Sequence, residues 1–381
     1  MRRFSPSWGV LWAALGLFAM QANAQRPQVS LEEGIFDNKT VLRVRIELGT
    51  NEVESLRREP RWYVSARVVE GSNLWGHVGL RLKGGSGSFR PLADKPSLTL
   101  SFNRFTQEGR FYGLKKIHLN NSVQDGSYLT ENICGEMYRR AGIPTPRVSY
   151  ATVSINGKDK GLYVVKEGFT KQFLGMYFTN RDGNLYDGGF VREITDPLDR
   201  DTESKDVNDW SDLRALAAAA REPDLGKRFG RMSQVLDMDR FLSFLALEIM
   251  TWNWDGYVMN RNNYRIYHNL DSGKLVFLPH GMDQMFWEVN QRIIPQPDRF
   301  NALVAKALME TEEGKEAYLR RFKSLYTNVF HLGLISNQVH SLSTLLQSHA
   351  GPDYSNHVRR IRFLIFAQHL NLANQLGQAD R

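Results

Sequence analysis

The stretch Asn253–Phe286, NWDGYVMNRNNYRIYHNLDSGKLVFLPHGMDQMF, decides how the rest of the sequence is interpreted. Two short apolar runs, Tyr264–Tyr267 and Leu275–Leu278, flank the sequence Asn-Leu-Asp-Ser-Gly at 269–273. Asp and Gly tolerate the backbone angles that a tight hairpin turn requires. The pattern therefore predicts a β-hairpin, which brings the segment before it close to the segment after it.

Three polar residues around this hairpin suggest a site for phosphoryl transfer. Asp255 is followed five residues later by Asn260, and Asp283 stands five residues beyond the second apolar run. In protein kinases a catalytic-loop Asp orients the acceptor hydroxyl, while an Asn five residues on and an Asp beyond a short hairpin hold the metal ions. The spacing predicts Asp255 as the catalytic residue, with Asn260 and Asp283 as ligands of a hard cation. A polar turn with capping side chains is the alternative, since the usual HRD and DFG letters are absent.

Two segments of this stretch resemble a known family. WNWDGYVMNRNNYRIY at 252–267 and FLPHGMDQMF at 277–286 are similar to the spore-coat protein H (CotH) type of atypical protein kinase, and the resemblance runs from about Val41 into the C-terminal third. The resemblance implies a divergent protein-kinase-like fold that binds ATP with Mg²⁺ or Mn²⁺. It also implies phosphorylation of an unidentified protein partner on serine, or on threonine.

A glycine-rich turn between two predicted strands is the second informative region. Val78–Lys83 and Pro96–Phe102 have strand-like patterns, and GGSGS at 84–88 lies between them. Glycines let backbone N–H groups approach a phosphate closely, although an ordinary hairpin turn explains a lone glycine-rich turn equally well. The residues predicted here to contact nucleotide phosphates are Lys83, Gly84, Gly85, Ser86 and Lys95.

The resemblance strengthens that interpretation and also shows a departure. The family pattern R-x-K/R-G-N-S followed by K-P corresponds here to 81–86 and to Lys95-Pro96, with Gly85 in place of the usual Asn. A contact from that Asn side chain is therefore missing. Lys95 is predicted to neutralise nucleotide phosphates as a kinase lysine does, and a solvent-facing lysine is the alternative.

A predicted helix over 125–141 carries two glutamates, Glu131 and Glu136, either of which is able to pair with that lysine. The sequence does not choose between them, and a solvated helix face is the default position for both. The family shows an Arg-Asn pair where this chain has Thr130-Glu131. Glu167 follows the strands that surround the Asn156-Gly157 turn, and the resemblance places it in the nucleotide site where the two lobes meet, with a surface position as the alternative.

The N-terminal 24 residues are predicted to be a Sec-type signal peptide. Arg2 and Arg3 precede an apolar run at 9–20 that is too short to span a bilayer comfortably, and Ala22-Asn23-Ala24 is a typical cleavage site. No later run is long enough for a membrane span. We expect a secreted or periplasmic protein without a transmembrane anchor after cleavage.

The remaining chain is predicted to be α+β, with a two-lobe kinase-like arrangement. After a loose leader at 25–40, a β-rich N-lobe at 41–168 binds the nucleotide phosphates and a mostly helical C-lobe at 169–381 carries the hairpin of 253–286. Within the C-lobe, the polar residues 179–211 are predicted to form an inter-lobe loop, and the long apolar run 238–252 a buried helix that leads to Asp255.

Composition sets further limits. The 381 residues include 49 Lys and Arg against 41 Asp and Glu, a formal net charge of +8. Such a protein suits acidic partners, but no concentrated basic run indicates nucleic acid. Cys134 is the only cysteine, so no internal disulfide forms.

Two other functions compete with the kinase. A pseudokinase that binds nucleotide or metal without transfer fits the departures at Gly85 and Thr130-Glu131, and it fits export because ATP is scarce outside the cytoplasm. A structural protein of the cell envelope or surface, with acidic turns that bind calcium, is less favoured because the D-x-[DN]-x-[DN]-G pattern is absent. A two-metal phosphatase or nuclease usually needs histidine ligands, and none are suitably placed.

Overall fold

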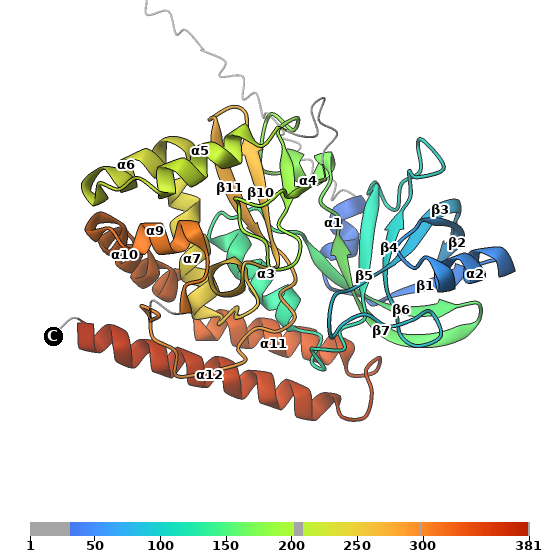
Figure 1. The fold of residues 1–381 in the computed structure, drawn as a ribbon. Helices are drawn as coiled ribbons and strands as arrows, with labels where there is room; N and C mark the ends of the chain where they lie inside the picture. The colour runs from blue at the N-terminus through green and yellow to red at the C-terminus, as the bar shows by residue number, and fades with distance from the viewer. Residues whose placement is uncertain (1–30, 202–208, 297–298, 380–381) are drawn as a thin grey trace, which may run out of the picture.

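The computed structural model describes residues 31–201, 209–296 and 299–379, and it shows a β-barrel beside a mostly helical part (Figure 1). The α+β class predicted from the sequence is confirmed. The predicted signal peptide and the first part of the leader lie outside the described residues. The rest of the leader contains a short helix, α1 (Leu31–Phe36), whose Ile35 is buried in the barrel's apolar cluster, so this part is not loose.

Seven strands form the barrel in the order β1-β2-β3-β4-β5-β7-β6. They are β1 (Leu42–Glu47), β2 (Val64–Glu70), β3 (Asn73–Lys83), β4 (Ser97–Ser101), β5 (Lys116–Asn120), β6 (Val148–Ile155) and β7 (Lys158–Glu167). Helix α2 (Thr50–Arg58) packs beside β2 with Leu56 buried. Parallel pairing of β1 with β6 closes the barrel, and Leu42 lies opposite Ala151.

The two faces of the barrel wall differ in polarity because side chains alternate along each strand. Leu80, Leu100 and Ile117 point inward and belong to one buried apolar cluster. On the outward face the register places Arg81 opposite Thr99, Thr99 opposite His118, and His118 opposite Lys166. A row of polar side chains therefore crosses four neighbouring strands.

The helical part contains ten described helices. They are α3 (Thr130–Arg140), α4 (Lys171–Gly175), α5 (Ser211–Ala220), α6 (Leu225–Val235), α7 (Met238–Met250), α8 (Tyr257–Asn260), α9 (Leu303–Met309), α10 (Glu312–Asn328), α11 (Leu332–Leu346) and α12 (Tyr354–Ala379). Helix α7 is buried along almost its whole length and packs against α10, so the predicted buried helix before Asp255 is confirmed.

A second sheet lies within the helical part and has the order β11-β10-β8-β9. Its strands are β8 (Leu185–Asp187), β9 (Asp199–Arg200), β10 (Tyr264–Asn269) and β11 (Lys274–Pro279). Antiparallel pairing of β10 with β11 confirms the predicted hairpin. The prediction of a loop throughout 179–211 is wrong at β8 and β9. Two short strands with little strand pattern of their own form there, because β8 pairs with β10 and β9 pairs with β8.

The barrel and the helices share one apolar core. Val148 and Val164, on the outward face of β6 and β7, belong to the same buried cluster as Ile133 of α3 and Leu245 of α7. The outer wall of the barrel is therefore covered by helix α3, which Figure 1 shows between the barrel and the other helices. Among the described residues, none of the helices combines the length and apolar character of a membrane span.

Candidate active site

The loop after α7 holds Asp255 in a defined orientation. Its Oδ1 accepts hydrogen bonds from Nδ2 of Asn260 at 2.7 Å and of Asn262 at 3.1 Å, and its Oδ2 accepts one from Nδ2 of Asn263 at 2.8 Å. The clustered asparagines of the sequence thus converge on one carboxylate. Asp255 is half-buried, so its carboxylate is fixed by these amides and is still accessible from solvent.

A buried carboxylate of α7 fixes the backbone of the same loop. Glu248 Oε2 accepts a hydrogen bond from the Val258 N–H at 2.8 Å, and Oε1 accepts from the Tyr257 N–H at 3.3 Å and from Asn253 Nδ2 at 3.1 Å. Burial raises the pKa of Glu248 to about 8, although the hydrogen bonds oppose that shift. No motif in the sequence marks Glu248, and its only signal is a carboxylate within the otherwise uncharged run 241–250 of α7.

Asn263 connects Asp255 to the segment that carries Asp283. Besides its bond to the Asp255 carboxylate, its Nδ2 donates to the Asp255 carbonyl at 3.0 Å, and its own carbonyl accepts from the His280 N–H at 2.9 Å. On the far side of Asp283, the Phe286 N–H donates to the Thr251 carbonyl at 2.7 Å. The hairpin therefore brings the two predicted aspartate segments together, as the sequence pattern suggested.

Asp283 lies in an electrostatically unusual position. Burial raises its pKa to about 6, with further contributions from the neighbouring charges of Glu131 and Asp125, while Lys166 opposes the shift. Among the described residues its carboxylate accepts no hydrogen bond except from its own backbone N–H. It lines a cavity of about 270 Å³ together with Asp125 and Thr130.

These features fit a divalent cation. Asn260 donates its Nδ2 to Asp255, and within the described residues no group donates a hydrogen bond to its Oδ1. A bound cation would balance the negative charge of the Asp283 carboxylate. Carboxylate and amide oxygens are the ligands that Mg²⁺ prefers. No group of three or more His, Cys, Asp or Glu side chains is arranged as a metal site in residues 31–201, 209–296 and 299–379, so substrate oxygens would have to complete the coordination.

A buried ion pair lies beside Asp283. Lys166 of β7 contacts Glu131 of α3, and their side chains are 0% and 3% exposed. The Lys166 Nζ is also 3.3 Å from Nδ1 of His280. Burial and the charge of Lys166 lower the pKa of His280 well below its usual value, so this imidazole is neutral at pH 7.

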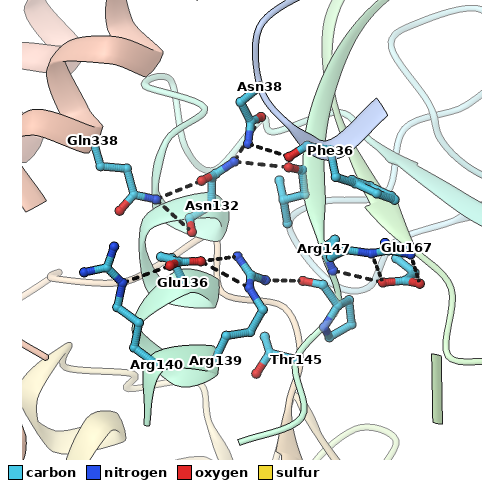
Figure 2. Close-up of polar contacts among 12 residues, drawn as sticks. Phe36, Asn38, Asn132, Glu136, Arg139, Arg140, Thr145, Arg147, Glu167 and Gln338 are labelled. Carbon is cyan, nitrogen blue, oxygen red and sulfur yellow. Dashed lines mark hydrogen bonds and ion pairs between the residues drawn. The ribbon is translucent and has the colours of Figure 1, made fainter. Parts of the chain in front are cut away.

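Of the two candidate glutamates, Glu131 is the one that pairs with a lysine, but that lysine is Lys166 and not the predicted Lys95. Glu136 instead forms ion pairs with Arg139 at 3.1 Å and Arg140 at 2.8 Å (Figure 2). The sequence analysis missed Lys166. Its signal is a single lysine on a strand face that is otherwise apolar, after Leu162 and Val164.

The two lysines predicted to contact phosphates lie in different surroundings. Lys83 Nζ donates to Asn120 Oδ1 at 2.7 Å. Burial and the charge of Lys166 lower the pKa of Lys83 to about 8, and the charges of Glu131 and Asp283 oppose the shift. The charge of Lys83 therefore interacts with the charges of Asp283 and Glu131.

Lys95 instead lies against aromatic rings. Its Nζ donates to the Tyr128 hydroxyl at 2.8 Å and lies 4.9 Å and 5.2 Å from the ring centroids of Tyr128 and Tyr163. Burial lowers the pKa of Lys95 to about 8, against the charges of Asp159 and Asp94. Neither predicted glutamate pairs with Lys95: Glu131 pairs with Lys166, and Glu136 pairs with two arginines.

The glycine-rich turn is tight and is tied to the strands below it. Gly84 has a φ of 111°, a conformation that favours glycine, and the Gly85 N–H donates to Ser88 Oγ at 3.0 Å. Asn121 Nδ2 donates to the carbonyls of Ser88 at 3.0 Å and Lys95 at 2.9 Å. Gly85 and Ser86 are exposed at the tip of the turn, next to Lys83.

Glu167 is held by an arginine. Its Oε1 is 2.8 Å from Nη2 of Arg147, and its Oε2 accepts from the Arg147 Nε at 3.0 Å (Figure 2). Glu167 is buried at the end of β7, where the chain passes from the barrel to the helical part. The Glu167 carboxylate is therefore already paired with Arg147, a contact that joins β7 to the segment before β6.

Sequence comparisons identify the family. The CotH kinase protein family profile matches residues 80–361, well over half of the chain, and the chain therefore belongs to this family. It is 25% identical over 243 residues to the inner spore coat protein H of Bacillus subtilis, a match that covers 59% of this chain and 66% of that protein. It is 22% identical over 246 residues to the invasin CotH7 of Rhizopus delemar, covering 59% and 41%.

A comparison with solved structures finds a more distant likeness. The proinflammatory kinase CtkA of Helicobacter pylori matches 74% of this chain and 93% of its own, with 9% identity and a TM-score of 0.37. At that TM-score the likeness does not define the fold. The chain spans less than two thirds of the length of the two relatives above, so their activities and partners do not transfer directly.

Proposed function

We propose that this chain is an exported CotH-type protein kinase, which transfers the γ-phosphate of ATP to serine or threonine hydroxyls of a protein. One observation carries the proposal: three asparagine amides orient the Asp255 carboxylate, and Asn263 joins it to the segment of Asp283. Membership of the CotH kinase protein family supports the same chemistry. In this proposal the barrel and the helical part act as the two lobes, and the predicted signal peptide directs export.

Asp255 would orient the acceptor hydroxyl and take up its proton. The bond from the acceptor oxygen to phosphorus forms as the bond from phosphorus to the ADP oxygen breaks, and the hydroxyl proton passes to the Asp255 carboxylate. The amides of Asn260, Asn262 and Asn263 hold that carboxylate in position before the substrate arrives, so little reorganisation is needed in the transition state.

The charges around Asp283 are suited to a metal-bound triphosphate. Asn260 Oδ1 and the Asp283 carboxylate would hold Mg²⁺ or Mn²⁺, which neutralises the phosphate charge when bound. Lys83 and Lys166 would add positive charge on the barrel side, and the backbone N–H groups of Gly84 and Ser86 would face the phosphates. Lys95 would reach the phosphates only after leaving the Tyr128 hydroxyl.

A second function, nucleotide or metal binding without transfer, has one specific structural argument. The Gly85 N–H and the Glu167 carboxylate are already hydrogen-bonded inside the protein. These two predicted contacts are therefore not free for a nucleotide unless the turn or Arg147 moves. A structural role in the cell envelope is the remaining alternative.

The decisive test is phosphate transfer by the purified chain. We would incubate it with γ-labelled ATP and Mg²⁺ or Mn²⁺, using casein and the protein itself as acceptors, beside the Asp255→Ala variant. Label that appears on protein and is lost in the variant is the expected result. Absence of label with nucleotide still bound by calorimetry would indicate the non-transferring module, and absence of both would indicate a structural protein.

A further inference from the structure

An aromatic ring on the outer barrel wall is covered by two arginines that the proposed chemistry does not use. The guanidinium carbons of Arg81 and Arg104 lie 4.9 Å and 5.1 Å from the ring centroid of Tyr63. Arg61 lies nearby. Burial lowers the pKa of Arg61, and the positive charge of Arg81 lowers it further. Three cations therefore share a small area of surface.

None of these three arginines has a carboxylate within ion-pair distance among the described residues. Arg61 donates to the backbone carbonyls of Leu82 and Gly84, and Arg81 and Arg104 contact the face of Tyr63. A nearby carboxylate, Asp201, is already 3.3 Å from Arg265. Within the described residues, therefore, no ion pair neutralises these three arginines, and their local charge is positive.

The arginines line a cavity of about 500 Å³, and large apolar side chains stand at its rim. Trp62 is 69% exposed and Phe105 is 50% exposed, and both line this cavity. Arginine and tryptophan are the residue types that contribute most to protein–protein binding, and exposed rings beside guanidinium groups are typical of a peptide-binding surface. We name this surface the arginine patch: Arg61, Trp62, Tyr63, Arg81, Arg104 and Phe105.

The arginine patch shares Arg104 with a second cavity, which residues of the helical part also line. Arg104 also lines a second cavity, of about 600 Å³, together with Lys115, Lys116 and Phe169, the second residue after β7. The pKa of Lys116 is lowered by burial and then by the charges of Arg81, Arg265 and Arg104, while Asp201 opposes the shift. Basic side chains therefore line both cavities, and Asp201 also lines the second one.

We propose that the arginine patch binds an acidic segment of the acceptor polypeptide. The cations supply the charge complementarity, and Trp62 and Phe105 supply apolar contact. The two cavities that share Arg104 give the length that an extended peptide needs rather than a single small anion. This inference rests on the proposed kinase function, because it identifies the acceptor as a protein with acidic residues near the phosphorylated hydroxyl.

The test measures peptide binding, independently of phosphate transfer. Fluorescence anisotropy with the whole chain would compare a short peptide containing a serine flanked by Asp and Glu with the same peptide carrying Lys in their place. The variant is R104E, because Arg104 contacts the Tyr63 ring, whereas Arg61 donates to the Gly84 carbonyl of the glycine-rich turn and is therefore kept. The matched control is R45E, because Arg45 is exposed on β1 and the change in net charge is identical.

We expect the acidic peptide to bind more tightly than the basic one, with binding that weakens as salt rises. Its affinity should fall at least about fivefold in R104E and less than about twofold in the control. Nucleotide binding by calorimetry should be the same in all three proteins. Equal affinity for both peptides, or equal losses in variant and control, would overturn the proposal. Tighter patch-dependent binding of single-stranded RNA than of the acidic peptide would also overturn it and assign the patch to nucleic acid. Peptide binding without phosphate transfer would keep the patch and remove the kinase.

Discussion

Gly256 offers a sharp test of how the Asp255 loop is held, through the substitution Gly256→Ala. A Cβ added at Gly256 would lie 2.4 Å from Oε1 of Glu248 and 2.5 Å from Nδ2 of Asn253. The backbone there has φ −86° and ψ −174°, an extended conformation that any residue adopts. The cost of the added methyl group therefore comes from the collision with the Glu248 hydrogen bonds and not from backbone strain.

The size of the effect follows from what the collision breaks. Glu248 Oε1 accepts from Asn253 Nδ2 and from the Tyr257 N–H, and both donors are buried. A buried donor without a partner costs about 1–3 kcal/mol, so we expect Gly256→Ala to lower the free energy of unfolding by about 2 kcal/mol. Displacement of the Asp255 loop should also reduce the rate of label transfer by at least about tenfold.

Urea unfolding followed by tryptophan fluorescence measures the stability change, and the midpoint should fall without a change in slope. Gly230→Ala is the matched control, because Gly230 is exposed in α6 and an added Cβ there meets nothing within 4 Å. That control should gain up to about 1 kcal/mol from helix propensity. If Gly256→Ala proved as stable and as active as the unchanged protein, the assigned role of Glu248 would be wrong.

Four further predictions concern the charges of the site. Asp283→Asn should abolish Mn²⁺-dependent nucleotide binding in calorimetry with an unchanged circular dichroism spectrum, and unchanged nucleotide affinity would refute the metal assignment. In the unchanged protein the Asp283 carboxylate, with its pKa raised to about 6, binds a proton in competition with the metal, so Mn²⁺ affinity should rise from pH 5 to pH 7 and then level off. Removing one partner of the buried ion pair, by Lys166→Met or Glu131→Leu, should lower the free energy of unfolding by about 3–5 kcal/mol. In urea unfolding the double variant should lose less than the sum of the two single losses, and additive losses would contradict a direct pair. The pKa of Glu248 is raised to about 8 in the folded state, so the folded protein binds more protons at this group than the unfolded chain between the ordinary pKa and about 8. The stabilisation from this group is therefore full at low pH and is lost as pH rises through that window. Glu248→Gln should flatten this pH dependence of the free energy of unfolding, measured by urea titrations at several pH values.

Much of the region around Asp255 was predictable because its signals are local. The turn at 269–273, the apolar runs on each side of it and the long apolar helix before it each depend on neighbouring residues in the sequence, and the structure contains all three. The same locality linked Asp255 to Asn260, since one loop contains both.

The rest of the site depends on contacts between distant segments. Lys166 and Glu131 come from a strand and a helix that are far apart in the sequence, and no spacing rule relates them. Lys95 was favoured by its position after the glycine-rich turn, but the nearby hydroxyl of Tyr128 is its hydrogen-bond partner. Strand β8 forms by pairing with β10, and β9 forms by pairing with β8; their own short sequences indicate neither pairing.

The parallel pairing of β1 with β6 also affects how the chain folds. Leu42 meets Ala151 and Ile46 meets Ile155, so the barrel is completed only by two segments separated by the rest of the wall. Joining distant segments carries a large loop-closure entropy, and folds with such non-local contacts form slowly. A chain that stops before β6 would leave β1 with an open edge, the kind of edge that pairs with other chains and leads to aggregation. Strand β7 pairs with both β5 and β6, so the wall can be closed only after the sequence has been made through Glu167.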